Sequence, residues 1–71
     1  MRKLTLIYKG RDDWDRPVYE NKGYLYVDVD PRSHMAPRIC TKNGNDFNGE
    51  PYDDIPGNIE IEFVPCRDVW S

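Results

Sequence analysis

Hydrophobic and polar positions alternate with a period of two in several parts of the chain. Residues 3–9 and 58–64 show this most clearly. The apolar side of these two segments consists of Leu4, Leu6, Tyr8, Ile59, Ile61 and Phe63. Such alternation is typical of strands with one buried and one solvated face. Both segments are therefore predicted to be strands whose apolar side chains face a core.

The stretch 16–29 has the pattern of a strand, a tight turn and a second strand. We predict strands over 17–20 and 24–29, joined by a turn in which Gly23 takes a positive φ. In the second strand, Leu25, Val27 and Val29 are expected to face the core. The opposite face carries Tyr24, Tyr26 and Asp28, and is either covered by a loop or left as a contact surface. The other strands are expected to assemble on this hairpin.

Turn formers and short apolar segments divide the rest of the chain. Residues 11–17 are predicted to form a polar connection in which Trp14 acts as a lid over the sheet, with an exposed binding role as the alternative. Residues 30–37 are predicted to be a loop and 38–42 a short strand. Residues 43–58 are predicted to be a long ordered loop anchored by Phe47, Tyr52 and Ile55, since idle loops of this length are uncommon in small domains. Val69 and Trp70 are expected to fold back onto the core.

These elements predict a single β-rich domain covering residues 1–71. We expect an all-β fold of about five antiparallel strands, arranged as a twisted sheet or a partly open barrel. A chain of 71 residues buries little apolar surface, so its nine aromatic residues are expected to supply much of the core.

Charge divides the chain into two unequal parts. Residues 1–42 carry nine Lys and Arg against six Asp and Glu, whereas residues 43–71 carry one Arg against seven acids. Two solvated faces of opposite bias would explain this split. The alternative is an acidic patch that meets a basic partner or imitates phosphate groups.

No residue pattern indicates a membrane span, a secretion signal, a cofactor or a metal site. Apolar runs stay far below the roughly 20 residues that cross a bilayer, and a cytoplasmic location is expected. The two cysteines, Cys40 and Cys66, are then expected to be reduced thiols. Together with the single histidine, His34, they lack the spacing of a zinc site. The segment 44–55 fails as a calcium loop because its first and twelfth positions are Gly44 and Ile55.

No catalytic constellation is visible, and we expect the chain not to be an enzyme. Asp28 and Asp30 could in principle hold a metal or move a proton, but a structural role is the simpler interpretation. His34 lies in a polar loop without a nucleophile beside it in the sequence.

Several short motifs resemble a known bacterial domain family. They are Asp13-Trp14-Asp15-Arg16-Pro17-Val18-Tyr19, Asp28-Val29-Asp30-Pro31-Arg32, Cys40-Thr41, Phe47-Asn48-Gly49-Glu50-Pro51, Glu62-Phe63 and Trp70. The chain resembles the twenty-eighth of the large polyvalent protein-associated domains, which occur in phages and conjugative elements of Firmicutes. The resemblance implies an accessory module of bacterial mobile elements, and it implies no catalytic residues.

The predicted function is a non-catalytic accessory or protein-interaction module with a protein partner. The expected interaction surface consists of Trp14, Tyr24, Tyr26, Phe47, Glu50 and Tyr52. One alternative is an acidic inhibitor or nucleic-acid mimic that uses Asp46, Glu50, Asp53, Asp54, Glu60 and Glu62. The other is a small nucleic-acid binder that uses Arg32, Arg38 and Lys42, with Tyr24 and Tyr26 as stacking platforms.

Overall fold

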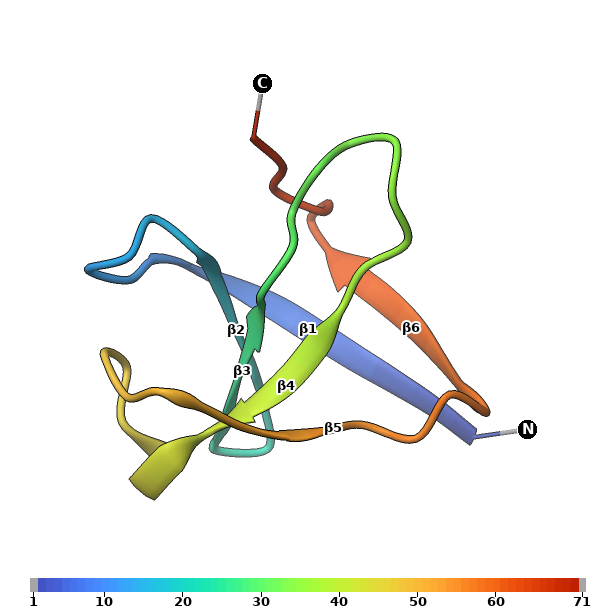
Figure 1. Cartoon of the computed structure of the whole chain (residues 1–71). Helices are drawn as coiled ribbons and strands as arrows, with labels where there is room; N and C mark the ends of the chain where they lie inside the picture. The colour runs from blue at the N-terminus through green and yellow to red at the C-terminus, as the bar shows by residue number, and fades with distance from the viewer. Residues whose placement is uncertain (1, 71) are drawn as a thin grey trace.

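The computed structural model describes residues 2–70 of the chain, which form one mixed sheet of six strands. The strands are β1 (Arg2–Arg11), β2 (Pro17–Asn21), β3 (Tyr24–Asp28), β4 (Ile39–Lys42), β5 (Pro51–Asp54) and β6 (Ile59–Val64). Their order across the sheet is β5-β4-β3-β2-β1-β6, and a short 3-10 turn, η1 (Asn43–Asn45), follows β4. Figure 1 shows that the sheet is strongly curled, with β4 and β5 lying across from β6.

The predicted all-β class and twisted sheet are confirmed. The sheet has one strand more than the five expected, because β5 lies inside the segment 43–58 that was predicted to be a loop. The last strand also differs from the expected antiparallel arrangement. β6 pairs with β1 in parallel, from Arg2 opposite Ile59 to Ile7 opposite Val64. This pairing places the first and last strands of the chain side by side.

The hairpin of β2 and β3 turns through Lys22 and Gly23. Both residues have positive φ, 51° at Lys22 and 86° at Gly23. Positive φ at both central positions is the mark of the two-residue turn whose twist matches that of the flanking strands. Asn21 and Tyr24 pair directly on either side of the turn. The predicted hairpin is therefore confirmed.

The concave face of the sheet holds the core. Leu6, Tyr19 and Ile39 are buried at its centre, and partly buried apolar side chains from β1, β3 and β6 surround them. The Tyr19 ring packs between Tyr8 and Phe63, with ring centroids 5.6 and 5.0 Å away. The side chains that alternate toward the core in β1 and β6 are those that the hydrophobic pattern predicted.

Leu25, Val27 and Val29 were expected to face the core, but the core cluster lies on the Tyr26 side of β3. That second face, expected to be either covered or left as a contact surface, is covered at Tyr26 and Asp28 and exposed at Tyr24. Tyr26 pairs with Tyr19 and Thr41 across the sheet and packs against the core cluster. Asp28 is fully buried on the same face. Val27 is fully buried as well, although it points to the opposite face. A central strand covered on both faces does not show a clean alternation of polar and apolar positions.

The segment between β4 and β5 covers the opposite face. The Phe47 ring lies against β1 at Gly10, whose φ of 131° and lack of a side chain permit a bulge there. Asn45 accepts a hydrogen bond from the Leu25 amide at 2.7 Å and donates one to the Gly23 carbonyl at 2.8 Å. This part of the predicted loop is ordered by its own contacts.

Candidate binding groove

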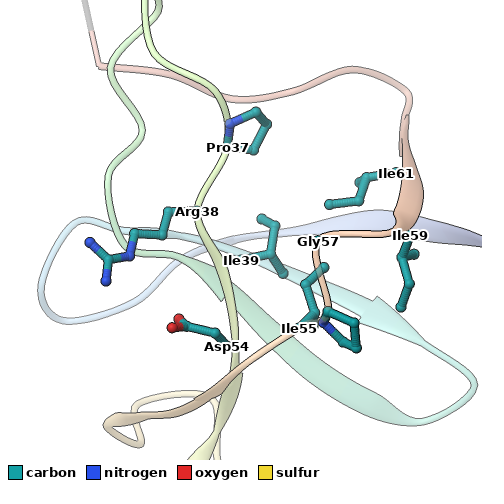
Figure 2. A pocket seen from close by; sticks show the side chains of 9 residues that line it. Pro37, Arg38, Ile39, Asp54, Ile55, Gly57, Ile59 and Ile61 are labelled. Carbon is teal, nitrogen blue, oxygen red and sulfur yellow. The ribbon is translucent and has the colours of Figure 1, made fainter.

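A groove of about 360 Å³, lined by both apolar and charged residues, lies between the two sides of the curled sheet. One wall comes from β6 and the other from the start of β4, and the connection between β5 and β6 forms the end. In Figure 2, Ile61 faces Pro37 and Ile39 across the hollow. The complete lining is Pro37, Arg38, Ile39, Asp54, Ile55, Pro56, Gly57, Ile59 and Ile61. The volume falls at the low end of the range of sites that hold small molecules or single peptide side chains.

The groove exists because the sheet curls without closing. β5 and β6 are the two ends of the strand order, so they do not pair with each other. The Ile55 amide donates a hydrogen bond to the Ile39 carbonyl at 3.2 Å, which holds the β5–β6 connection against β4. Ile55 and Ile61 also pack against the core cluster. The floor of the groove is thus continuous with the core.

Charged side chains flank the apolar centre of the groove. Figure 2 shows that the charged ends of Arg38 and Asp54 point away from the hollow. The Asp54 carboxylate accepts a hydrogen bond from the Cys40 thiol at 2.9 Å. On β6, Glu60 and Glu62 alternate with the groove-lining isoleucines and are exposed. Both edge strands are therefore acidic on their solvent sides.

The residues of the expected acidic patch are all exposed, but they lie on different parts of the sheet. All six residues are exposed: Asp46, Glu50, Asp53, Asp54, Glu60 and Glu62. Asp53 and Asp54 belong to β5, whereas Glu60 and Glu62 belong to β6 at the other edge of the sheet. Glu62 is also engaged within the chain, since its carboxylate lies 3.2 Å from the Lys3 ammonium.

The six residues of the expected interaction surface have different environments. Trp14, Tyr24 and Tyr52 are 63, 65 and 70% exposed, and Glu50 is exposed as well. Trp14 is therefore not the lid that was favoured in the sequence; its ring instead lies 5.9 Å from the Arg16 guanidinium carbon. Tyr26 packs against the core, and Phe47 is half-buried against β1. These six side chains come from four separate segments of the chain.

Of the three basic residues expected to bind nucleic acid, Lys42 is not accessible to a ligand. The Lys42 side chain is completely buried, and its ammonium donates to Asp12 at 2.6 Å and to the Gly49 carbonyl at 3.0 Å. Arg32 is held by Asp30 through two hydrogen bonds of 2.8 Å. Lys42 therefore cannot reach a phosphate group, because its charge is already used inside the protein.

Asp12 organises the turn between β1 and β2. Its carboxylate accepts hydrogen bonds from the Trp14 and Arg16 amides, the Arg16 guanidinium and the Lys42 ammonium. Burial raises the pKa of Asp12, but the hydrogen bonds from Lys42 and Arg16 outweigh it and lower the pKa to about 2. In the sequence, Asp12 is one of three aspartates around Trp14. The sequence alone did not identify Lys42 as the distant partner of Asp12.

The segment after β6 is fastened to the sheet by a second set of polar contacts. The Arg67 guanidinium lies 3.3 Å from the buried Asp28 carboxylate and donates to the Met35 carbonyl at 2.9 Å. The Asp68 carboxylate accepts hydrogen bonds from the Tyr8 hydroxyl at 2.7 Å and from Arg11 at 2.8 Å. These bonds raise the pKa of Tyr8 and lower that of Asp68.

The final described residue docks on two loops and not, as was expected, on the core: Trp70 is 39% exposed and is not part of the core cluster. The Trp70 amide donates to the Pro31 carbonyl and its indole N–H donates to the Asp15 carbonyl, both at 2.8 Å. Val69 is half-buried. The loop 30–37 and the segment 66–70 therefore support each other at one end of the sheet.

The potentially reactive side chains lie apart from the groove centre or are held in an inactive form. Burial and the neighbouring Asp54 raise the pKa of the Cys40 thiol to about 11, so it is protonated and poorly nucleophilic at neutral pH. Cys66 is exposed and is not bonded to Cys40. His34 is exposed in its loop. Among residues 2–70, no three His, Cys, Asp or Glu side chains are grouped closely enough to hold a metal ion.

The described part of the chain has no helix that is long and apolar enough to cross a bilayer. Comparisons with protein-family models, curated proteins and solved structures found no significant match to the chain, so the resemblance to the polyvalent protein-associated domain stays a prediction.

Proposed function

We propose that this domain is a non-catalytic module that binds a partner protein through the groove between β4 and β6. The observation that carries the proposal is an open groove in which Ile39, Ile55 and Ile61 connect the lining with the core of the domain. Rigid, concave and apolar surfaces lose little entropy when a partner fills them. The groove can therefore receive one or a few side chains of another protein without rearranging.

An accessory role in bacterial mobile elements fits this proposal. The resemblance rests on the segments Asp13–Tyr19 and Phe47–Pro51, which the structure places next to each other: the Asp13 amide donates to the Asn48 side chain at 3.1 Å. These segments shape the face of the sheet opposite the groove. They therefore support the fold, and the binding surface is assigned to the groove.

Gly57 offers a direct test of the groove. It lines the groove, its φ is not in the left-handed region, and a Cβ built on it would meet no atom within 4 Å. Gly57→Leu therefore adds a bulky side chain at the lining of the groove, and its Cβ meets no atom of the core. Ser33→Leu is the matched control, since Ser33 is an exposed loop residue outside the groove.

The measurement is quantitative capture of proteins from a lysate of the source cells by the three forms of the domain. We expect a protein that the parent domain and Ser33→Leu retain and that Gly57→Leu loses, with all three forms equally folded by circular dichroism. Equal capture by Gly57→Leu, or the absence of any specifically captured protein, would contradict the proposal.

The acidic inhibitor is retained as a second candidate because all six acidic residues between positions 46 and 62 are exposed. A phosphate mimic binds its basic partner mainly through charge, so raising the salt from 50 to about 500 mM should abolish its binding. Such binding would also be insensitive to Gly57→Leu. These two responses separate the mimic from the groove-binding module.

A further inference from the structure

We propose that the partner enters the groove as an added strand along the free edge of β6, and that this segment alternates apolar and basic side chains. The inference rests on the proposed function and specifies the chemistry of the partner. Three properties of β6 lead to it: an open edge, an apolar inner face and an acidic outer face.

The open edge supplies the backbone contacts. β6 is six residues long and pairs with β1 on one side only. Within residues 2–70, no strand pairs with its other side, which borders the groove. An extended peptide can form main-chain hydrogen bonds with such an edge, and these bonds contribute affinity without regard to sequence.

The inner face selects apolar side chains. Ile59 and Ile61 point to the groove side of the sheet, and side chains of an added strand alternate between the same two faces. Every second side chain of the added strand therefore enters the groove between Ile61 and Ile39. A volume of about 360 Å³ accommodates aliphatic side chains there.

The outer face selects basic side chains. The remaining side chains of the added strand lie beside Glu60 and Glu62, at the distance of a directly opposed cross-strand pair. A diagonal contact of the same charges exists on the other side of β6, where the register places Lys3 opposite Glu60 and Thr5 opposite Glu62. There, β1 presents Lys3 to Glu62 at 3.2 Å and turns Leu4 and Leu6 toward the core. Lys3 of β1 is thus an internal example of a basic side chain held beside an acidic residue of β6.

The same charges disfavour a second copy of this chain at the edge. Pairing of β6 with β6 of another molecule would place glutamates next to glutamates, and pairing with β5 would place them next to whichever of Asp53 and Asp54 shares their face. Like charges that face each other directly destabilise a strand pair. A basic segment of a different protein is the occupant that fits.

The test uses short synthetic peptides of the same length as β6. The probe alternates lysine and valine; one control alternates glutamate and valine, and a second contains the probe residues with all valines contiguous. Fluorescence anisotropy at low salt should give a dissociation constant on the order of 100 µM for the probe, typical of a small interface. Both controls should bind at least about tenfold more weakly.

Variants of the domain locate the binding site. Gly57→Leu should weaken binding of the probe by about tenfold or more, because it adds a bulky side chain at the lining of the groove. Glu60→Lys should weaken it about fivefold and strengthen binding of the glutamate peptide, as expected for an exposed charge pair. Hydrogen exchange should show new protection of β6 amides when the probe is bound. Ser33→Leu should bind the probe like the parent domain.

Absence of probe binding up to about 1 mM, equal binding of the glutamate peptide, or protection confined to strands other than β6 would overturn the inference. These outcomes are distinguishable from failure of the proposed function. A captured protein that Gly57→Leu loses would still support a groove-binding module, even if the alternating peptide does not bind.

Discussion

Asp12 and Asp28 are buried carboxylates, and each is held by a cation from a distant segment. Lys42 lies 30 positions after Asp12, and Arg67 lies 39 positions after Asp28. A buried carboxylate that loses its partner retains the full cost of its desolvation. These residues therefore bind the 12–16 turn and the 66–70 segment to the sheet.

We expect Asp12→Ala to be strongly destabilising. It leaves the Lys42 ammonium buried without a carboxylate and removes the acceptor for the Trp14 and Arg16 amides. The expected loss is about 3 kcal/mol, a large part of the stability of a domain this small. Urea denaturation followed by tryptophan fluorescence measures it.

Two variants serve as controls for Asp12→Ala. Asp13→Ala, at an exposed neighbouring position, should change the stability by no more than about 0.5 kcal/mol. Lys42→Met should cost less than Asp12→Ala, because Asp12 keeps Arg16 and two amide donors. If Asp13→Ala and Asp12→Ala had equal effects, the network would not have the role assigned to it.

The same carboxylate predicts a loss of stability in acid. The pKa of Asp12 is lowered to about 2 in the folded protein, against 3.8 ordinarily. A depressed folded pKa contributes stability that is fully present above the unfolded pKa and is lost as the pH falls through the folded one. The free energy of unfolding should therefore decrease between about pH 4 and pH 2.

Asp12→Asn isolates this contribution from those of the other carboxylates. Because the pKa values of Asp30 and Asp68 are also lowered, both forms lose stability in acid. The stability difference between the parent and Asp12→Asn should shrink as the pH approaches 2. A difference that stays constant from pH 5 to pH 2 would show that Asp12 does not titrate as described.

At the scale of elements, alternation in the sequence was enough to identify β1, β2, β3, β4 and β6, together with the inward residues of β1 and β6. β5 could not be recognised, since Pro51-Tyr52-Asp53-Asp54 combines a proline with two acids. Its extended form comes from pairing with β4, where Lys42 faces Pro51 and Cys40 faces Asp54. Propensity gives way to tertiary pairing in such short edge strands.

The groove itself was beyond prediction from the sequence. Ile59 and Ile61 were correctly expected to point inward, but only the curl of the sheet brings them opposite Pro37 and Ile39. The burial of Lys42 was equally hidden, because the partner carboxylate lies in another turn. Both features depend on contacts between segments that are distant in the sequence.

The turn between β2 and β3 gives a prediction about an element. Lys22 occupies a left-handed position with φ of 51°, which asparagine tolerates better than lysine. Because the Lys22 side chain is exposed, Lys22→Asn should stabilise the domain by about 0.5 kcal/mol and raise Tm by a few degrees. Thermal unfolding followed by circular dichroism tests this.

Gly23→Ala is a control for this turn and should have the opposite effect on Tm. Its φ of 86° is strained for alanine, so Tm should fall. A decrease in Tm for Lys22→Asn would contradict the assignment of the turn.

At the scale of the whole molecule, the sheet has two exposed edges, and both carry acids on the solvent side. Charges on edge strands oppose the pairing of one sheet with another. Glu60 and Glu62 serve this purpose on β6, and Asp53 and Asp54 serve it on β5. These charges are therefore expected to disfavour self-association through either edge.

The double substitution Glu60→Val and Glu62→Val should remove this protection. We expect concentration-dependent self-association, measured by size-exclusion chromatography with light scattering. Glu20→Val is the control, since β2 is an internal strand and has no free edge. If the double variant remained monomeric at high concentration, the glutamates would not be what prevents edge pairing.

The parallel pairing of β1 with β6 has a consequence for the order of events during synthesis. β1 to β5 form a meander of neighbouring strands, so these pairings can form while the chain is still emerging from the ribosome. β1 cannot pair with β6 until residues 59–64 have been synthesised. The hydrogen bonds that Tyr8, Arg11 and Tyr19 form with Asp68 also have to form late. Until then the apolar residues of β1 stay uncovered on one edge, which makes the nascent meander the form of this protein most exposed to misassembly.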